Sequence, residues 1–90
     1  MASGNNPVGS YVNKTAIANI LPRDGQLLGF YVNSTSSGTV TLYDSATTTT
    51  TVPISGTITP AIGWNPYPIQ FNSGLYAVIG GTLNVTFSVA

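Results

Sequence analysis

Cysteine, histidine and glutamate are absent from this 90-residue chain. Without cysteine it can form neither disulfides nor zinc–thiolate sites. The usual general bases and thiolate nucleophiles are missing as well. Its only acids, Asp24 and Asp44, fall in predicted turns, where an Asp side chain caps nearby backbone N–H groups. We therefore predict that the protein is not an enzyme and has no catalytic, metal-binding or cofactor-binding residues and no cofactor.

Charge of either sign is scarce, since charged residues make up 4% of the chain against about 25% in an average domain. The positive side chains are Lys14 and Arg23, and two cations cannot neutralise a track of phosphates, so nucleic acid is not an expected partner. A hydrophobic content of 42% indicates a folded chain rather than a disordered one. A surface with so little charge repulsion tolerates close packing against neighbours.

Long apolar runs are also lacking. The most apolar early segment, residues 16–21, is interrupted by Asn19 and is far too short to span a bilayer, so no membrane partner is expected. Residues 1–9 have neither the basic nor the apolar region of a signal peptide, and we predict that none is present.

β-Branched and aromatic residues dominate, and turn residues interrupt them every eight to twelve positions. Period-two alternation predicts a hairpin in which strands around Leu28–Asn33 and Thr39–Tyr43 are joined by a polar turn at 34–38. A second hairpin is predicted from Leu75–Ile79 and Thr82–Val89, because Gly80-Gly81 can supply the positive φ angles of a tight turn. No segment has the apolar period of a helix.

The remaining segments are expected to be short strands and loops. Residues 11–21 are extended and end at a turn over 22–25, and residues 52–59 form one or two strands. Three prolines within 60–68 argue against regular pairing there, and 69–71 forms a short strand. The predicted fold is an all-β, small antiparallel β-sandwich of seven to eight short strands, jelly-roll-like or immunoglobulin-like, with a small β-barrel as the alternative. Residues 10–90 are expected to be one domain.

An aromatic, proline-rich loop is the strongest candidate for binding. Trp64 and Tyr67, with Phe71, can form an exposed platform for a protein partner or for sugar rings, or they can cover the end of the core. Three Asn-X-Thr sequences, at Asn13, Asn33 and Asn84, are interpreted as a by-product of a chain rich in Asn and Thr.

Three stretches resemble small β-rich virion proteins of tailed bacteriophages. They are Gly38–Asp44 (GTVTLYD), Ile54–Pro60 (ISGTITP) and Gly74–Thr82 (GLYAVIGGT), within a region of resemblance over residues 28–89. The shared features are strand, turn and hairpin spacings. The resemblance implies a capsid decoration (cement) protein or a related head or tail component.

On this basis we expect a non-enzymatic virion structural protein that stabilises the phage head through oligomeric, largely uncharged contacts. The expected partners are the major capsid protein or another virion protein and copies of itself, with a trimer favoured. The expected location is the capsid surface, after synthesis in the host cytoplasm. The alternatives are a glycan- or receptor-binding tail-fibre module that uses Trp64 and Tyr67, and a subunit of an extracellular filament built by strand exchange.

The first nine residues are expected to be a flexible arm that contacts neighbouring subunits through Asn5, Asn6 and Pro7. Their composition lacks the apolar area to offset backbone ordering, which costs about 1–2 kcal/mol per residue. Deleting residues 2–8 should therefore leave the melting temperature of the isolated domain nearly unchanged while weakening assembly. Protected amide signals from Asn5 and Asn6 in the monomer, or unchanged assembly of the truncated chain, would contradict this prediction.

Overall fold

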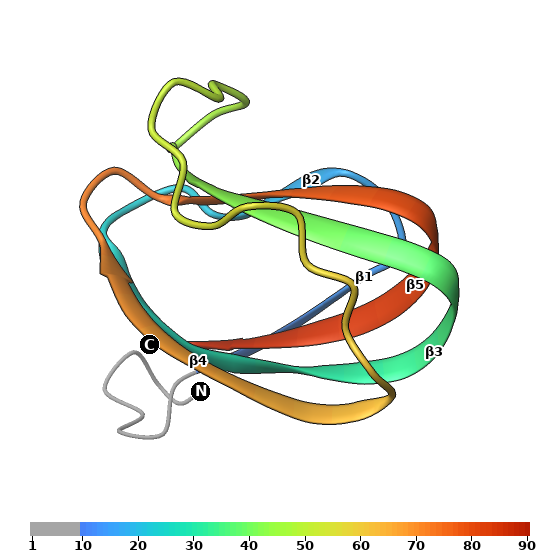
Figure 1. The fold of residues 1–90 in the computed structure, drawn as a ribbon. Coiled ribbons are helices and arrows are strands. Elements are labelled where there is room, and N and C mark those ends of the chain that lie inside the picture. The colour runs from blue at the N-terminus through green and yellow to red at the C-terminus, as the bar shows by residue number, and fades with distance from the viewer. Residues whose placement is uncertain (1–9) are drawn as a thin grey trace.

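A computed structural model describes residues 10–90 and folds them into five antiparallel strands (Figure 1). They are β1 (Ser10–Lys14), β2 (Ala18–Leu21), β3 (Gly25–Asp44), β4 (Gly63–Phe71) and β5 (Leu75–Val89). The sheet order is β1-β5-β3-β4, and β2 also pairs with β5. Within these residues there is no helix, and hence none long and apolar enough to cross a membrane. The all-β antiparallel class is confirmed, whereas the expected seven to eight short strands were wrong.

Two long strands, β3 and β5, form the centre of the fold. They pair along nearly their whole length, from Leu27 opposite Val89 to Asp44 opposite Leu75. Both bend, so one ladder passes through two layers (Figure 1). The first half of β3 and the second half of β5 lie with β4 and β1 in what we call the β1/β4 layer. The other halves lie with β2, and segment 53–58 extends this β2 layer beside β3 through isolated bridges at Pro53 and Ile58.

The two predicted hairpins were wrong, because their turn residues lie inside β3 and β5. Ser36 and Ser37 both pair with Thr82, which is a β-bulge and bends the strands. Ser37 has φ 57° and Gly81 has φ 66°, so the left-handed backbone predicted for a turn is present but is used for the bend. A glycine is required at Gly38 because a Cβ there would lie 2.6 Å from the Thr82 carbonyl oxygen.

Three smaller expectations also differ from the structure. Residues 52–59 form isolated bridges with β3 rather than strands. The segment 60–68 is partly regular, since β4 begins at Gly63, and it accommodates Pro66 and Pro68 because β4 is an edge strand of the sheet. A bulge between Leu27 and Gly29 shifts the alternation, so Leu27 rather than Leu28 is fully buried.

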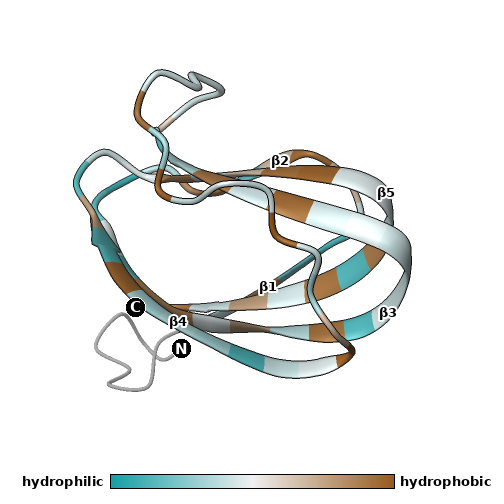
Figure 2. Ribbon diagram, in the orientation of Figure 1, coloured by the Kyte–Doolittle hydropathy of each residue, from teal (hydrophilic) through white to brown (hydrophobic). Residues whose placement is uncertain are grey.

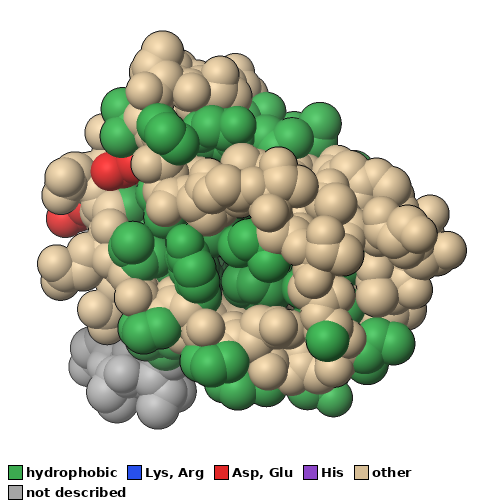
Figure 3. Space-filling model, in the orientation of Figure 1, with side chains coloured by type: hydrophobic (Ala, Val, Ile, Leu, Met, Phe, Trp, Pro, Cys, Tyr) green, Lys and Arg blue, Asp and Glu red, His purple; other side chains and the backbone are tan. Residues whose placement is uncertain are grey.

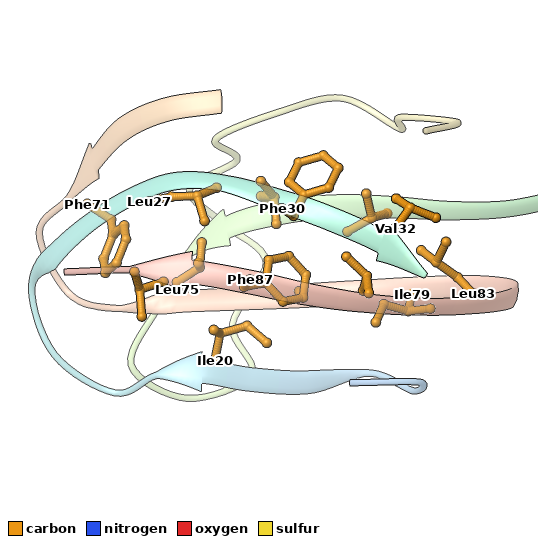
Figure 4. Packing of buried hydrophobic residues seen from close by; sticks show 14 residues of the cluster. Ile20, Leu27, Phe30, Val32, Phe71, Leu75, Ile79, Leu83 and Phe87 are labelled. Carbon is orange, nitrogen blue, oxygen red and sulfur yellow. The ribbon is translucent and has the colours of Figure 1, made fainter. Parts of the chain in front are cut away.

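The core lies between the inner faces of the two layers. Phe30 and Phe87 meet near its centre with ring centroids 5.9 Å apart (Figure 4). Apolar and polar residues alternate along the strands, so each strand buries one side (Figure 2). Burying this apolar area stabilises the fold by about 25 cal/mol per Å². The other fully buried large side chains are Leu27, Val32, Val40, Leu42, Leu75, Leu83 and Val85.

One side of the sandwich leaves apolar side chains partly exposed. Strand β4 and segment 53–58 both lie beside β3, one in each layer. Their inward side chains pack against the core without being fully covered. Figure 3 shows hydrophobic side chains in a hollow on this side of the molecule. We call this set the apolar margin, which consists of Ile54, Ile58, Tyr67 and Ile69.

Replacing Phe87 tests the core. Phe87 is fully buried and contacts Phe30, so Phe87→Ala should destabilise the domain by about 3–5 kcal/mol. Chemical denaturation measures this free energy, with Val52→Ala as the control because Val52 is 53% exposed. A loss for Phe87→Ala as small as that of the control would show that the core is not packed in this way.

Candidate binding face

The outer face of the β1/β4 layer carries three exposed aromatic side chains. Tyr11 of β1 is 73% exposed, Tyr31 of β3 is 48% exposed and Trp64 of β4 is 51% exposed. The register places Trp64 opposite Tyr31, and Tyr31 opposite Thr86 of β5. Tyr11 is opposite Ser88, the next outward position of β5. Aromatic residues from three strands therefore lie on one surface.

A depression of about 380 Å³ lies among these residues. Its lining consists of Tyr11, Tyr31, Asn33, Trp64, Thr86 and Ser88. Two small residues, Gly29 and Ser88, face each other in the ladder here, and both are buried. The Trp64 ring covers Gly29, since a Cβ on that glycine would lie 2.7 Å from Cζ2 and Cη2 of the indole. The depression forms because Gly29 and Ser88 are small, whereas the side chains around them are large aromatic rings.

Three asparagines from three strands meet beside the depression. The Asn13 side-chain amide donates to Asn84 Oδ1 at 2.8 Å and to Thr86 Oγ1 at 2.9 Å. From the other side, the Asn33 amide donates to the same two oxygen atoms, each at 3.1 Å. Asn13 also donates to the Val85 carbonyl at 3.3 Å. We call these four residues, Asn13, Asn33, Asn84 and Thr86, the amide network.

The two predicted aromatic site residues lie on opposite faces of β4. Trp64 points outward, so its interpretation as a cover of the core was wrong. Tyr67 points inward and packs against Phe30 with ring centroids 6.5 Å apart, and Phe71 is buried. The two residues therefore do not form one platform. Asn5, Asn6 and Pro7, the other predicted interface residues, lie outside the described residues.

Sequence reasoning missed Tyr11, Tyr31 and the amide network. The alternation in the sequence indicated only that Tyr31 and the network residues of β3 and β5 lie on the side away from the apolar residues. Their gathering depends on which strands are neighbours, because residues 11, 31, 64 and 86 meet only through the order β1-β5-β3-β4. The three Asn-X-Thr sequences were the available signal, since Asn33 and Asn84 fall on the polar side of alternating strands predicted from the sequence.

Asp44 holds the loop between β4 and β5. Its Oδ2 accepts the backbone N–H of Asn72 at 2.9 Å, and its Oδ1 accepts those of Ser73 at 2.8 Å and Gly74 at 3.3 Å. The bond from Asn72, followed by those from Ser73 and Gly74, lowers the pKa of Asp44 below its ordinary value of 3.8, although partial burial opposes this. Asp44 thus has a structural partner, and residues 10–90 contain no cluster of three or more potential metal ligands.

Comparison with known proteins adds no relative. No protein family, curated protein or solved structure shows a significant match to the chain. The resemblance to phage virion proteins is therefore carried only by the three sequence stretches.

The hydrogen bonds to Asp44 make stability depend on pH. A carboxyl group whose pKa is lowered by folding stabilises the protein above its unfolded value, and this contribution disappears as the pH falls through the folded value. Asp44→Asn should therefore cost about 1 kcal/mol near pH 7, and less at an acid pH below the lowered pKa of Asp44.

Denaturation at the two pH values measures both differences. Asp24→Asn is the control, because no hydrogen bond to the Asp24 carboxylate from residues 10–90 is found. An Asp44→Asn deficit that is the same at both pH values would mean that the charge is not involved.

Proposed function

We propose that this protein is a non-enzymatic structural protein of a phage particle, and that it decorates the outer capsid. In this proposal it attaches to the major capsid protein or another virion protein, and associates with its own copies, through uncharged contacts. The observation that carries the proposal is the placement of its few charges.

All four charged side chains lie at strand ends or in a turn. Lys14 is the last residue of β1, Asp44 is the last residue of β3, and Arg23 and Asp24 lie in the turn between β2 and β3. Asp44 is already engaged by the backbone of the β4–β5 loop. In Figure 3 the only charged atoms on the visible face are acidic and lie at its edge. The apolar margin contains no charged side chain, so a neighbour can cover it without desolvating a charge.

The apolar margin is the surface best suited to such an attachment. Its four side chains are aliphatic or aromatic and are only partly covered within the described chain. A partner that covers them gains the stabilisation of apolar burial, about 25 cal/mol per Å². Interfaces of this kind bury few charged groups and are typical of stable assemblies. Tyr67 belongs to this surface, while Trp64 lies on the opposite face of β4.

The edge strand β4 argues against assembly by strand exchange at this edge. Pro66 and Pro68 have no N–H group, so β4 lacks two of the backbone donors that an added strand needs. Prolines and short edges are common devices that prevent sheet-to-sheet pairing. Attachment through side chains at the apolar margin is therefore favoured over a filament built through β4.

Particles of the phage that encodes the chain test this proposal. The protein should be found on the capsid surface by electron microscopy and should stay attached when NaCl rises from about 50 mM to about 1 M, because there is little Coulombic attraction to screen. Release by salt, or a location inside the particle, would contradict it.

A matched pair of variants tests the apolar margin itself. Ile54→Thr should weaken attachment, whereas Val52→Thr should not, because Val52 is exposed and lies outside the margin. Melting temperatures of both variants establish that the domain is still folded. Equal attachment of the two folded variants would place the contact elsewhere.

A further inference from the structure

We propose that the outer face of the β1/β4 layer is a carbohydrate-binding site for an unbranched, neutral oligosaccharide. The site is the depression between Tyr11, Tyr31 and Trp64, together with the amide network. This inference goes beyond capsid attachment, because the site faces away from the apolar margin across the sheet. A protein attached through the margin would keep this face available to a ligand.

The aromatic rings supply the stacking surface that such a ligand needs. A pyranose ring has one or two faces of C–H groups, and these pack on aromatic rings as other apolar groups do. Tyr31 and Trp64 are direct neighbours on adjacent strands, and Tyr11 lies across the depression on the far side of β5. The three aromatic side chains therefore lie around one depression, where a chain of several sugars can contact more than one of them. The volume, about 380 Å³, falls at the small end of the range for ligand pockets, about 300–1,000 Å³.

The amide network supplies hydrogen-bonding groups in fixed positions. The Nδ2 atoms of Asn13 and Asn33 are turned toward Asn84 Oδ1 and Thr86 Oγ1. Within the described residues this leaves Oδ1 of Asn13, Oδ1 of Asn33 and Nδ2 of Asn84 for a ligand. Two acceptors and one donor suit sugar hydroxyl groups, each of which both donates and accepts. Because the network already fixes these amides, little side-chain entropy is lost on binding.

The absence of charge selects the class of ligand. None of the residues that line the depression is charged, so the site offers no counter-ion for a sulfate, phosphate or carboxylate group. A protein partner could use exposed Trp and Tyr side chains. However, Asn33 and Thr86 line the hollow and belong to the amide network, which favours a ligand rich in hydroxyl groups. A neutral sugar chain uses the rings and the amides together.

Titration of the purified full chain with cellohexaose, xylohexaose and chitohexaose tests the site. Trp64 is the only tryptophan in the chain, so its fluorescence reports directly on the depression, and calorimetry measures the same affinities. At least one of these neutral sugars should bind at concentrations up to about 5 mM. Binding should be insensitive to NaCl, and a heparin-derived hexasaccharide, which is strongly anionic, should bind more weakly.

Variants assign the binding to individual groups. Trp64→Ala and Tyr31→Ala should each weaken calorimetric binding about tenfold, as expected for the loss of one stacking contact. Asn33→Ala should weaken it as well, through the amide network. Trp64→Phe keeps a ring and should bind within about threefold of the parent, which separates the loss of stacking from a loss of folding. Val52→Ala is the control, because Val52 is exposed at a site remote from the ring-lined depression.

The inference is overturned if none of the three neutral sugars binds the folded protein, or if Trp64→Ala binds as well as Val52→Ala. Stronger binding of the anionic sugar, lost in high salt, would also overturn it. If Trp64→Ala detaches the protein from particles without affecting any sugar, the face is a protein interface. Failure of Ile54→Thr to affect attachment bears only on the proposed capsid contact, so the two proposals fail separately.

Discussion

The pairing of β3 with β5 is the constraint on which the whole structure depends. Every other strand attaches to one of these two: β1 and β2 to β5, and β4 and segment 53–58 to β3. Because the two strands bend together, one hydrogen-bonded ladder supplies the centre of both layers. The concave side of this bent ladder encloses the core. Without the bend, the same strands would expose one complete apolar face.

The register of this ladder also determines the candidate binding face. Side chains alternate between the two sides of a strand, so a slip of one residue would exchange the inner and outer sets. The register that buries Phe30 opposite Phe87 is the same one that places Tyr31 opposite Thr86 and Gly29 opposite Ser88. Core packing therefore specifies how the outward side chains are arranged, and no separate interaction is needed to form the depression.

Composition and alternation predicted the fold class and the buried terminal segment. Asp44 accepts from backbone N–H groups, as expected of a structural Asp, but it ends β3 and these groups belong to the distant β4–β5 loop rather than to a turn of its own. They did not predict the length of β3 and β5, because a bend within a strand and a turn between two strands have the same features. Both use glycine and serine residues and a backbone with positive φ. One signal was overlooked. The apolar positions before Gly80, such as Ile79, and those after it, such as Leu83, keep the same odd-numbered phase through the Gly-Gly pair. A continuous phase is what a single bent strand with one buried side produces.

The candidate face shows a second limit of sequence reasoning. Trp64 and Tyr67 are three residues apart and were treated as one site, yet a strand places them on opposite faces. Asn13, Asn33 and Asn84 are separated by 20 to 71 positions, yet their side chains share hydrogen bonds. From the sequence, the three asparagines were interpreted as a by-product of a chain rich in Asn and Thr. In the structure their side chains belong to one hydrogen-bonded network. Asn84 accepts from a neighbour on either side, so it links β1 and β3 across β5.

A polar network on an outer sheet face is exposed to water and adds little stability by itself. Its more distinctive effect is to fix the orientation of three amides beside three exposed aromatic side chains. A ligand with hydroxyl groups can recognise amides held in this fixed orientation.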